Sequence, residues 1–157
     1  MSGFLDRIVL GYQEWVALPK LHIPIIKAKV DTGATLSTLH AIDIKRVWRH
    51  GIPHVKFTVH PFLQDKRIER HCCLPIIDRR TIVSSNGERE LRYIVKTFLR
   101  LQNKRIEIEL TLTDRSTMRF PMLLGRKALV GVAVVDPGKA YYLGKFNTME
   151  AENLYIK

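Results

Sequence analysis

The strongest constraint in this sequence is an aspartate placed where an alternating, largely apolar run ends in a tight turn. The run covers residues 25–30 and is followed by Asp31, Thr32 and Gly33. Alternation of this kind predicts a β-strand, and Gly33 lets the backbone turn without a Cβ in the way. Thr32 can supply a hydroxyl that braces the loop. The pattern therefore predicts a strand that delivers an acid into a supported turn.

A second motif raises the significance of the first, because Asp-x-Gly alone is also an ordinary turn. Residues 120–129 form an apolar segment that runs into Gly125 and Arg126 and then into a short helical pattern. The two motifs together, in this order, resemble the retropepsin-like aspartic proteases. The chain is most similar to a small bacterial branch whose members are often labelled ATP-dependent zinc proteases and whose genes can accompany an ATP-grasp glutamate ligase.

This resemblance implies an all-β fold, a closed retropepsin-like barrel with a flap hairpin and one short helix after the Gly-Arg motif. We expect residues 1–157 to form a single domain that carries one half-site. Asp31 would be the catalytic acid, and Thr32, Gly33 and Ala34 would support its loop. Because two neighbouring carboxylates share one proton in such enzymes, the second acid should come from another copy of the chain across a twofold axis.

Gly125 and Arg126 would, by the same resemblance, form a structural motif behind the catalytic loop. In the viral enzymes the arginine pairs with an acid four residues after the catalytic aspartate, a position that Thr35 occupies here. The sequence leaves open which acid replaces it. The candidates are Asp43, Asp114 and Asp136.

Asp136 also offers an intrachain rival to Asp31, since Asp136, Pro137 and Gly138 follow two valines. Proline has no hydroxyl and fixes φ, so the bracing role expected of Thr32 cannot be repeated there. Asp-Pro-Gly is typical of a plain turn. We therefore expect Asp136 to have no catalytic role.

Most other segments predict strands. Residues 8–18 predict a first strand region ended by Pro19, and residues 42–48 have both helical and strand character. Residues 105–112 alternate strictly, which predicts that Ile106, Ile108, Leu110 and Leu112 face inward and that Glu107, Glu109 and Thr111 face outward.

A hairpin is predicted around residues 84–87, because Asn-Gly between extended segments favours a tight turn. In a retropepsin-like fold this hairpin occupies the place of the flap that closes over substrate. The flap would span about residues 79–95, with Asn86 and Gly87 at its tip. The alternative is a surface hairpin with no gating role.

The charge of the chain points to anionic partners. There are 26 Lys and Arg residues against 15 Asp and Glu, a formal net charge of +11. Such a field attracts nucleic acid, an anionic membrane face or an acidic peptide. The alternative is a soluble surface that is basic without a binding role. The N-terminal residues do not have the pattern of a signal peptide or a membrane span, so we expect a cytoplasmic protein without a membrane partner.

Metal and nucleotide sites are not predicted. The histidines lack a His-Glu-x-x-His motif, and His54 and His60 would lie about 20 Å apart along one strand. The sequence has no Gly-x-x-x-x-Gly-Lys-Ser/Thr loop for ATP. Cys72 and Cys73 are the only cysteines and are adjacent, so a disulfide within one chain is not expected. We therefore predict no cofactor and no metal.

The sequence as a whole favours a homodimeric aspartic endopeptidase with a peptide or protein substrate. The implied link to a glutamate ligase makes acidic or glutamylated protein tails the expected substrate class. The alternative is a catalytically inactive, basic binding module for RNA, the ribosome or an acidic protein partner.

Overall fold

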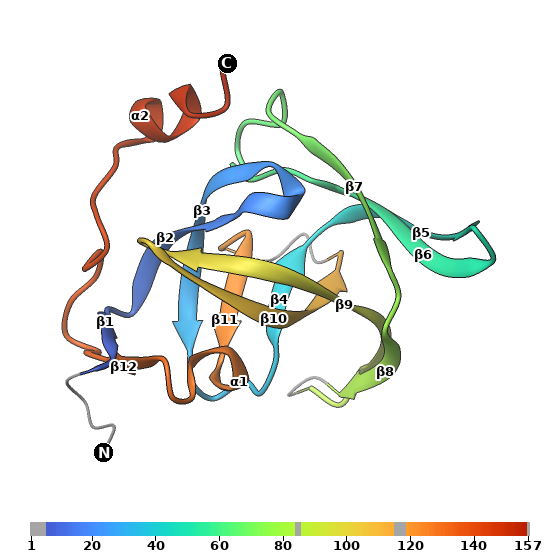
Figure 1. The fold of residues 1–157 in the computed structure, drawn as a ribbon, viewed down its shortest axis with the longest axis horizontal. Helices are drawn as coiled ribbons and strands as arrows, with labels where there is room; N and C mark the ends of the chain where they lie inside the picture. The colour runs from blue at the N-terminus through green and yellow to red at the C-terminus, as the bar shows by residue number, and fades with distance from the viewer. Residues whose placement is uncertain (1–5, 84–85, 115–118, 157) are drawn as a thin grey trace.

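The computed structural model describes residues 6–83, 86–114 and 119–156, and strands dominate it (Figure 1). The predicted all-β class is therefore confirmed at the level of a mostly β fold. The strands are β1 (Ile8–Leu10), β2 (Gln13–Leu18), β3 (Ile23–Asp31), β4 (Ser37–His40), β5 (Ile42–Arg49), β6 (Ile52–Val59), β7 (Arg70–Pro75), β8 (Asp78–Val83), β9 (Arg89–Leu101), β10 (Lys104–Thr113), β11 (Met122–Gly125) and β12 (Ala133–Val135).

The largest sheet has the strand order β10-β4-β11-β3-β2-β9-β8, and β9 also pairs with β10. This last pairing joins the sheet into a ring of hydrogen-bonded strands (Figure 1). The antiparallel β9–β10 ribbon runs in register from Leu101 opposite Lys104 to Ile94 opposite Thr111. Gln102 adopts φ 56° in the turn that connects these two strands. The alternating segment 105–112 is thus a strand, as predicted, and lies within β10.

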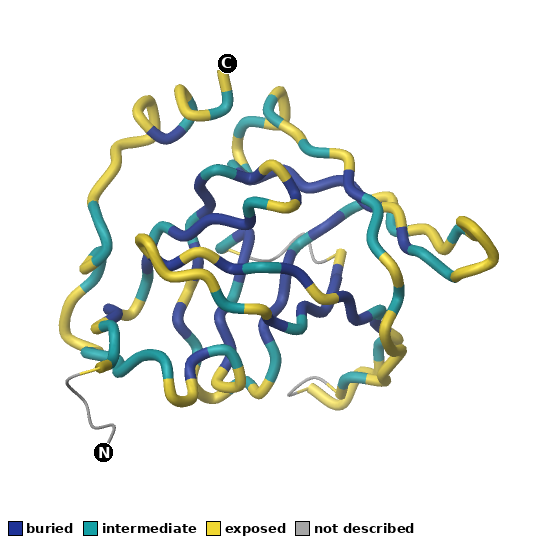
Figure 2. Tube along the Cα trace, in the orientation of Figure 1, coloured by how far each residue is buried: buried dark blue, intermediate teal, exposed yellow. Residues whose placement is uncertain are grey.

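The core lies inside this ring, where the alternating apolar residues of the strands meet (Figure 2). Along β3, Ala28 and Val30 are buried while Lys27 and Lys29 lie outside the core, as the alternation predicts. The largest fully buried side chains are Leu10, Leu18, Ile23, Ile26, Leu39, Ile94, Leu99, Leu101, Leu110, Leu112, Met122 and Leu124.

Thr111 departs from the prediction for β10. It was expected to face solvent, yet it is only 1% exposed. The reason is that β10 pairs with β9 on one side and with β4 on the other. The Thr111 hydroxyl lies 2.9 Å from that of Thr38 and donates to the carbonyl of Ser37. Its polar group is therefore satisfied by β4 rather than by water.

The predicted first strand region is two strands in two different sheets. β1 pairs with β12 in parallel, whereas β2 pairs with β3 and β9. The break falls at Gly11, where an added Cβ would lie 2.2 Å from the carbonyl oxygen of Lys139. The C-terminal part of the chain passes so closely there that only glycine fits.

A separate three-stranded sheet, β5-β6-β7, carries a hairpin that extends away from the ring at the right of Figure 1. We call this hairpin, residues 42–59, the arm. The segment 42–48, which sequence left undecided, is strand β5. His50 and Gly51 both have positive φ, 53° and 73°, between the paired residues Arg49 and Ile52. Two such residues form a tight hairpin turn that matches the twist of the strands.

Helices are short. A 3-10 turn, η2 (Pro19–Leu21), follows β2, and α1 (Arg126–Leu129) starts directly after Gly125, where a short helix was expected. The helix α2 (Thr148–Asn153) was not predicted; its N-terminus is closed by a capping box between Asn147 and Glu150. None of the helices in the described ranges is long and apolar enough to cross a membrane.

Candidate active site

Asp31 is the last residue of β3 and begins the loop that the sequence predicted. One oxygen of its carboxylate, Oδ1, accepts a hydrogen bond from the Gly33 backbone at 3.1 Å. The backbone N–H of Ala34 donates to the Asp31 carbonyl at 3.2 Å, which closes the turn. Asp31 is half-buried, and Thr32 and Gly33 are exposed. The strand thus holds the acid at the surface of the chain in a fixed turn.

The second carboxylate oxygen of Asp31, Oδ2, accepts no hydrogen bond from the described residues. Nor does another carboxylate in the described ranges hydrogen-bond to Asp31. An oxygen left in this state can bind water or share a proton with a second acid.

Gly125 lies beside this loop because β11 pairs in parallel with β3. The register places Gly125 opposite Asp31 and Leu124 opposite Val30. A Cβ on Gly125 would lie 2.4 Å from the carbonyl oxygen of Leu36 and 3.0 Å from that of Ala34. The backbone of the Asp31 loop therefore passes over Gly125 at a distance that excludes any side chain.

Gly33 is under much less steric constraint than the sequence suggested. A Cβ on Gly33 would meet only the Asp31 carboxylate oxygen, at 3.3 Å. The glycine that the fold of one chain requires at this site is Gly125.

Ser37 connects the two motifs from the other end of the loop. Its hydroxyl is buried and accepts a hydrogen bond from the Gly125 backbone at 3.1 Å. The sequence alone gives no motif that singles out Ser37. Its position six residues after Asp31 gave no sign of this bond, because the donor lies 88 residues further along the chain.

Arg126 makes hydrogen bonds to three residues of the Asp31 loop. Its backbone donates to the Ala34 carbonyl at 2.7 Å. Its guanidinium donates to the Thr32 carbonyl at 2.8 Å and to the Thr35 hydroxyl at 3.3 Å. Arg126 therefore contacts the Asp31 loop through a carbonyl and a hydroxyl.

The three acids considered as partners of Arg126 do not pair with it within the described residues; they are Asp43, Asp114 and Asp136. The Arg126 guanidinium donates instead to the neutral hydroxyl of Thr35, at the position where the viral enzymes have an acid. Thr35 can do this because a hydroxyl oxygen accepts a hydrogen bond from an arginine without being charged.

Asp136 has a turn that resembles that of Asp31 but a different environment. Its Oδ1 accepts from the Gly138 backbone at 2.9 Å, as Asp31 accepts from Gly33. Its Oδ2, in contrast, accepts a hydrogen bond from the Tyr142 hydroxyl. The Tyr142 hydroxyl and then the Gly138 N–H hold the pKa of Asp136 below its usual value. Both oxygens of Asp136 are therefore occupied by its own turn.

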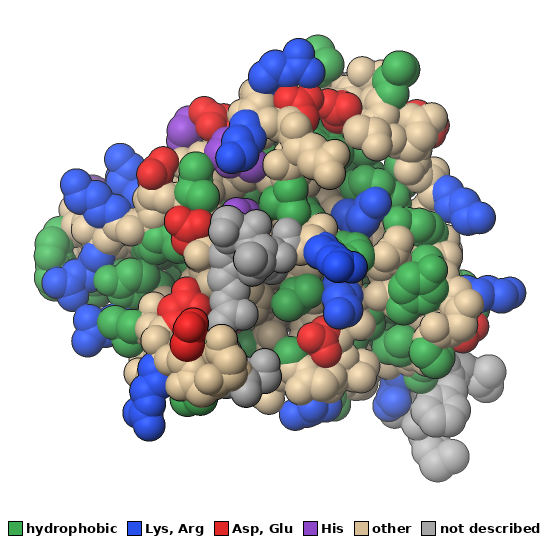
Figure 3. Space-filling view, turned by 180° about the vertical axis from the view of Figure 1, so that it is seen from behind, with side chains coloured by type: hydrophobic (Ala, Val, Ile, Leu, Met, Phe, Trp, Pro, Cys, Tyr) green, Lys and Arg blue, Asp and Glu red, His purple; other side chains and the backbone are tan. Residues whose placement is uncertain are grey.

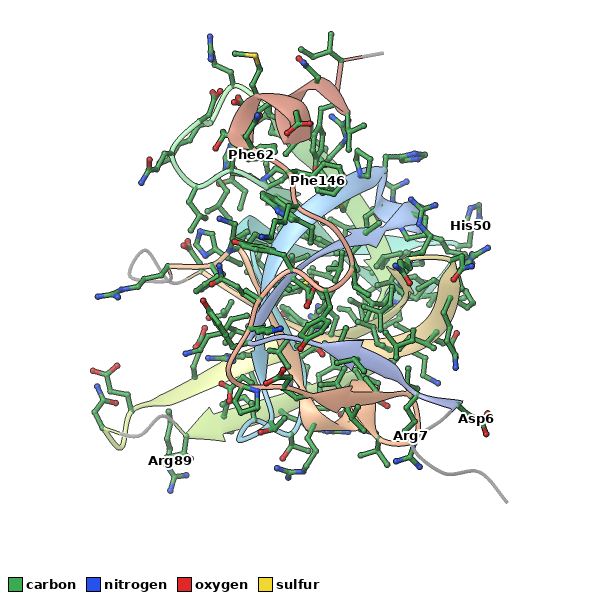
Figure 4. The ribbon with its side chains drawn as sticks, turned by 90° about the vertical axis from the view of Figure 1, so that its left-hand side faces the viewer. Asp6, Arg7, His50, Phe62, Arg89 and Phe146 are labelled. Atoms are coloured by element: carbon green, nitrogen blue, oxygen red, sulfur yellow. The ribbon has the colours of Figure 1, made fainter. Side chains whose placement is uncertain are left out.

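The predicted flap corresponds to an antiparallel hairpin of β8 and β9, paired from Asp78 opposite Ile94 to Val83 opposite Arg89. Figure 4 shows it extending beyond the rest of the fold, with Arg89 near its end. Ser84 and Ser85 of the predicted hairpin lie outside the described residues. Gly87 has φ 85°, and Asn86 accepts a hydrogen bond from the Glu88 backbone at 3.2 Å.

The histidines near β6 and β7 form a hydrogen-bonded chain. One carboxylate oxygen of Glu69 is hydrogen-bonded to His60 Nε2 at 3.1 Å, and the other is hydrogen-bonded to His71 Nε2 at 3.0 Å. Nδ1 of His71 contacts the Thr58 hydroxyl at 3.1 Å. Across the described part of the chain, no three His, Cys, Asp or Glu residues are grouped so that they could hold a metal ion. Cys72 and Cys73 are free thiols.

Comparison with known proteins places these features in one family. The family model described as "RimB-like: Retropepsin-like aspartic endopeptidase RimB" matches residues 9–145. A solved structure of a Legionella pneumophila protein of unknown function is similar with a TM-score of 0.71 and 29% identity, covering 86% of this chain and 97% of that one.

Two curated relatives are both named probable alpha-L-glutamate ligase. The one from Shewanella halifaxensis is 43% identical over 96% of this chain and 33% of its own length. The one from Desulfotalea psychrophila is 40% identical over 100% of this chain and 34% of its own length. The chain thus spans about a third of the length of these relatives. With the family model covering both the Asp31 loop and the Gly125-Arg126 motif, the chain belongs to the RimB-like family of retropepsin-like aspartic endopeptidases.

Proposed function

We propose that the chain is an aspartic endopeptidase that acts as a homodimer, with one Asp31 from each copy. The observation that carries this proposal is the Asp31 loop itself. The loop is fixed by Gly125, Ser37 and Arg126, yet it presents a carboxylate oxygen without a donor among the described residues. One chain supplies a single acid of this kind, so the site is complete only when a second loop faces it.

The chemistry follows from bringing two such carboxylates together. Two like charges at close range cannot both be ionised, so the pair holds one proton. The ionised Asp31 takes a proton from water as the water oxygen attacks the peptide carbonyl carbon. The protonated Asp31 of the other copy gives its proton to the carbonyl oxygen. Proton transfer to the amide nitrogen then breaks the C–N bond and releases an acid and an amine.

The hairpin of β8 and β9 would act as the flap in this assembly. Asn86 and Gly87 lie near its end, and a two-stranded ribbon offers backbone groups to an extended peptide. Binding of substrate between the flap and the Asp31 loop would exclude water from the reacting bond.

Acidic or glutamylated tails are the substrate class that we favour. Relatives that carry a region like this chain are named probable alpha-L-glutamate ligase, and this chain corresponds to about a third of them. A hydrolase beside a ligase would remove or shorten the glutamate chains that the ligase makes. The net charge of +11 complements such a substrate. The same link makes association with an ATP-grasp ligase part of the proposal.

The decisive experiment uses the two similar turns of the chain as variant and control. Asp31→Asn keeps the shape of the side chain but removes the acid, so cleavage of a glutamate-rich peptide should be abolished. Asp136→Asn makes the same chemical change in a turn of the same kind and should leave cleavage intact. Mass spectrometry of the products and sedimentation of both variants measure cleavage and dimer formation. Chelators should have no effect, since the mechanism needs no metal.

Cleavage that persists in purified Asp31→Asn would overturn the proposal. If the protein is monomeric at a concentration where it cleaves the peptide, the proposal that it acts as a homodimer is overturned. Tight binding of acidic protein without hydrolysis would favour the inactive binding module instead.

A further inference from the structure

An exposed tryptophan and an arginine of the arm lie beside a cavity whose lining includes a second arginine, Arg79 of β8, and does not include Asp31. The cavity, of about 400 Å³, lies between the arm and the start of the β8–β9 hairpin. Its lining residues are Arg46, Pro53, Ile76, Ile77, Asp78, Arg79 and Tyr93. Trp48 stands next to this cavity on the same face of the arm, because residues two apart on a strand share a face. The register confirms this, since Trp48 is opposite Pro53.

Trp48, one of the two tryptophans of the chain, is 65% exposed, although a tryptophan side chain is large and mostly apolar. The guanidinium carbon of Arg46 lies 5.8 Å from the centre of the Trp48 ring. This contact orients the ring without covering it. An exposed, flat aromatic ring beside a cation is a platform on which a further planar group can stack.

The charges around this platform are open to an anion. Neither the Arg46 nor the Arg79 guanidinium has an acidic partner within the ranges that the structure describes. Asp78, the one acid in the cavity lining, is occupied: it accepts from the Arg79 backbone and from Arg80 Nε, both at 2.8 Å. The cavity therefore has two available cations and no available carboxylate.

The opposite face of the arm adds to this positive field. Lys45 lies directly opposite Lys56, and like charges in such a pair destabilise a sheet. Figure 3, seen from behind, shows basic side chains gathered around the projecting end at the left of the view.

We propose that the arm binds single-stranded RNA, with a base stacked on Trp48 and the backbone phosphates paired with Arg46 and Arg79. Cations on the outer strand β5 would by themselves be explained as protection of a sheet edge against strand pairing. An exposed tryptophan has no such protective role, and an acidic peptide has no flat ring to stack on it. The combination of an aromatic platform with a basic groove is how proteins hold single strands without reading sequence. This binding site is independent of Asp31.

The test measures fluorescence anisotropy of a labelled uridine oligonucleotide of about twelve nucleotides with the full chain and its variants. Trp48→Leu should weaken binding about five- to hundredfold, the range measured for loss of one stacked base, and Trp48→Phe should restore most of it. Arg46→Gln with Arg79→Gln should lower the slope of log affinity against log salt by about 1.4, about 0.7 for each lost phosphate contact.

The matched control lies on the other face of the same hairpin. Lys45→Gln with Arg49→Gln also removes two positive charges, but from the face of β5 that points away from Trp48. It should therefore reduce the salt slope much less and leave the effect of Trp48→Leu unchanged. Thermal unfolding shows whether each variant folds. Asp31→Asn should bind the oligonucleotide as the parent chain does, which separates this proposal from the peptidase proposal.

Several outcomes would overturn the RNA site. One is absence of binding at about 0.05 M salt, where phosphate contacts are strongest. Another is an equal loss of RNA affinity in the Lys45 and Arg49 double variant and in the Arg46 and Arg79 double variant, which would indicate that only the total charge matters. A third is tighter binding of a glutamate peptide of matched charge with no effect of Trp48→Leu, which would assign the arm to acidic polypeptides.

Discussion

Asp31 and Gly125 lie opposite each other on the adjacent parallel strands β3 and β11. The Asp31 loop and the Gly125-Arg126 motif are thus neighbours in the structure, although Thr32 and Arg126, which are joined by a hydrogen bond, are 94 residues apart in the chain. The absence of a side chain on Gly125 lets the loop from Ala34 to Leu36 cross over β11. The position of the acid therefore depends on a glycine in a different strand.

Gly125→Ala should destabilise the chain by about 3 kcal/mol, because a Cβ placed 2.4 Å from the Leu36 carbonyl oxygen forces the backbone to move. Gly33→Ala is the matched control. Its Cβ would meet only a carboxylate oxygen at 3.3 Å, so we expect a loss below about 1 kcal/mol. Urea unfolding of the two variants gives the comparison. Equal losses would show that the loop does not depend on close approach to Gly125.

Arg126→Ala should loosen the Asp31 loop, since it removes the hydrogen bonds to the Thr32 carbonyl and the Thr35 hydroxyl. Both partners are exposed, so we expect a modest loss of about 1 kcal/mol. Thr35→Val removes one of the two bonds. A double-mutant cycle in urea should give a coupling of about 0.5 kcal/mol between these positions. Strict additivity would mean that Thr35 is not the partner of Arg126 in solution.

Much of the site was predictable because its signals are local. The alternation of residues 25–30, the turn at Gly33 and the helix after Gly125 depend on neighbours in sequence. The errors concern residues whose partners are distant. Thr111 was expected to face solvent because periodicity does not reveal β4. The partner of Arg126 stayed open because the resemblance supplied only an acid at a position that Thr35 occupies here. Residues 42–48 were undecided in sequence because they fit two periodicities, and only the pairing with β6 across the turn at His50 and Gly51 makes them a strand.

The adjacent cysteines should differ in reactivity. Burial raises the pKa of the Cys72 thiol to about 11, whereas Cys73 is half-buried. The thiolate is the reactive form, so iodoacetamide at pH about 8 should label Cys73 well before Cys72. Peptide mass spectrometry after short labelling measures the two rates. Equal rates in the folded chain would contradict the burial of Cys72.

The same shift predicts a change in stability with pH. Between the ordinary thiol pKa of about 8.5 and the raised value, the unfolded chain loses the Cys72 proton before the folded chain does. The folded state is therefore favoured below this window and loses stability as the pH rises through it. Cys72→Ala should reduce this part of the pH dependence in urea unfolding. An unchanged profile in Cys72→Ala would assign the effect to other groups.

Glu14 holds the C-terminal part of the chain against β2. It is fully buried, and its carboxylate accepts three backbone N–H groups: Gly11 at 2.6 Å, Tyr142 at 2.9 Å and Leu143 at 3.0 Å. Beyond this contact, Phe146 packs edge-on against Trp15 and lies close to α2 in Figure 4. The buried side chain of Glu14 thus joins segments that are 128 residues apart.

Glu14→Gln should cost about 2–4 kcal/mol, because an amide replaces one acceptor oxygen with a donor and leaves at least one buried N–H facing it. Glu107→Gln, on the exposed side of β10, is the matched control and should change stability by less than about 0.5 kcal/mol. Urea unfolding gives the global effect, and amide hydrogen exchange gives the local one. The amides of Tyr142 and Leu143 should exchange faster in Glu14→Gln while those of β9 and β10 keep their protection relative to global unfolding. Slow exchange at both positions in the variant would show that the C-terminal part is held by its aromatic contacts rather than by Glu14.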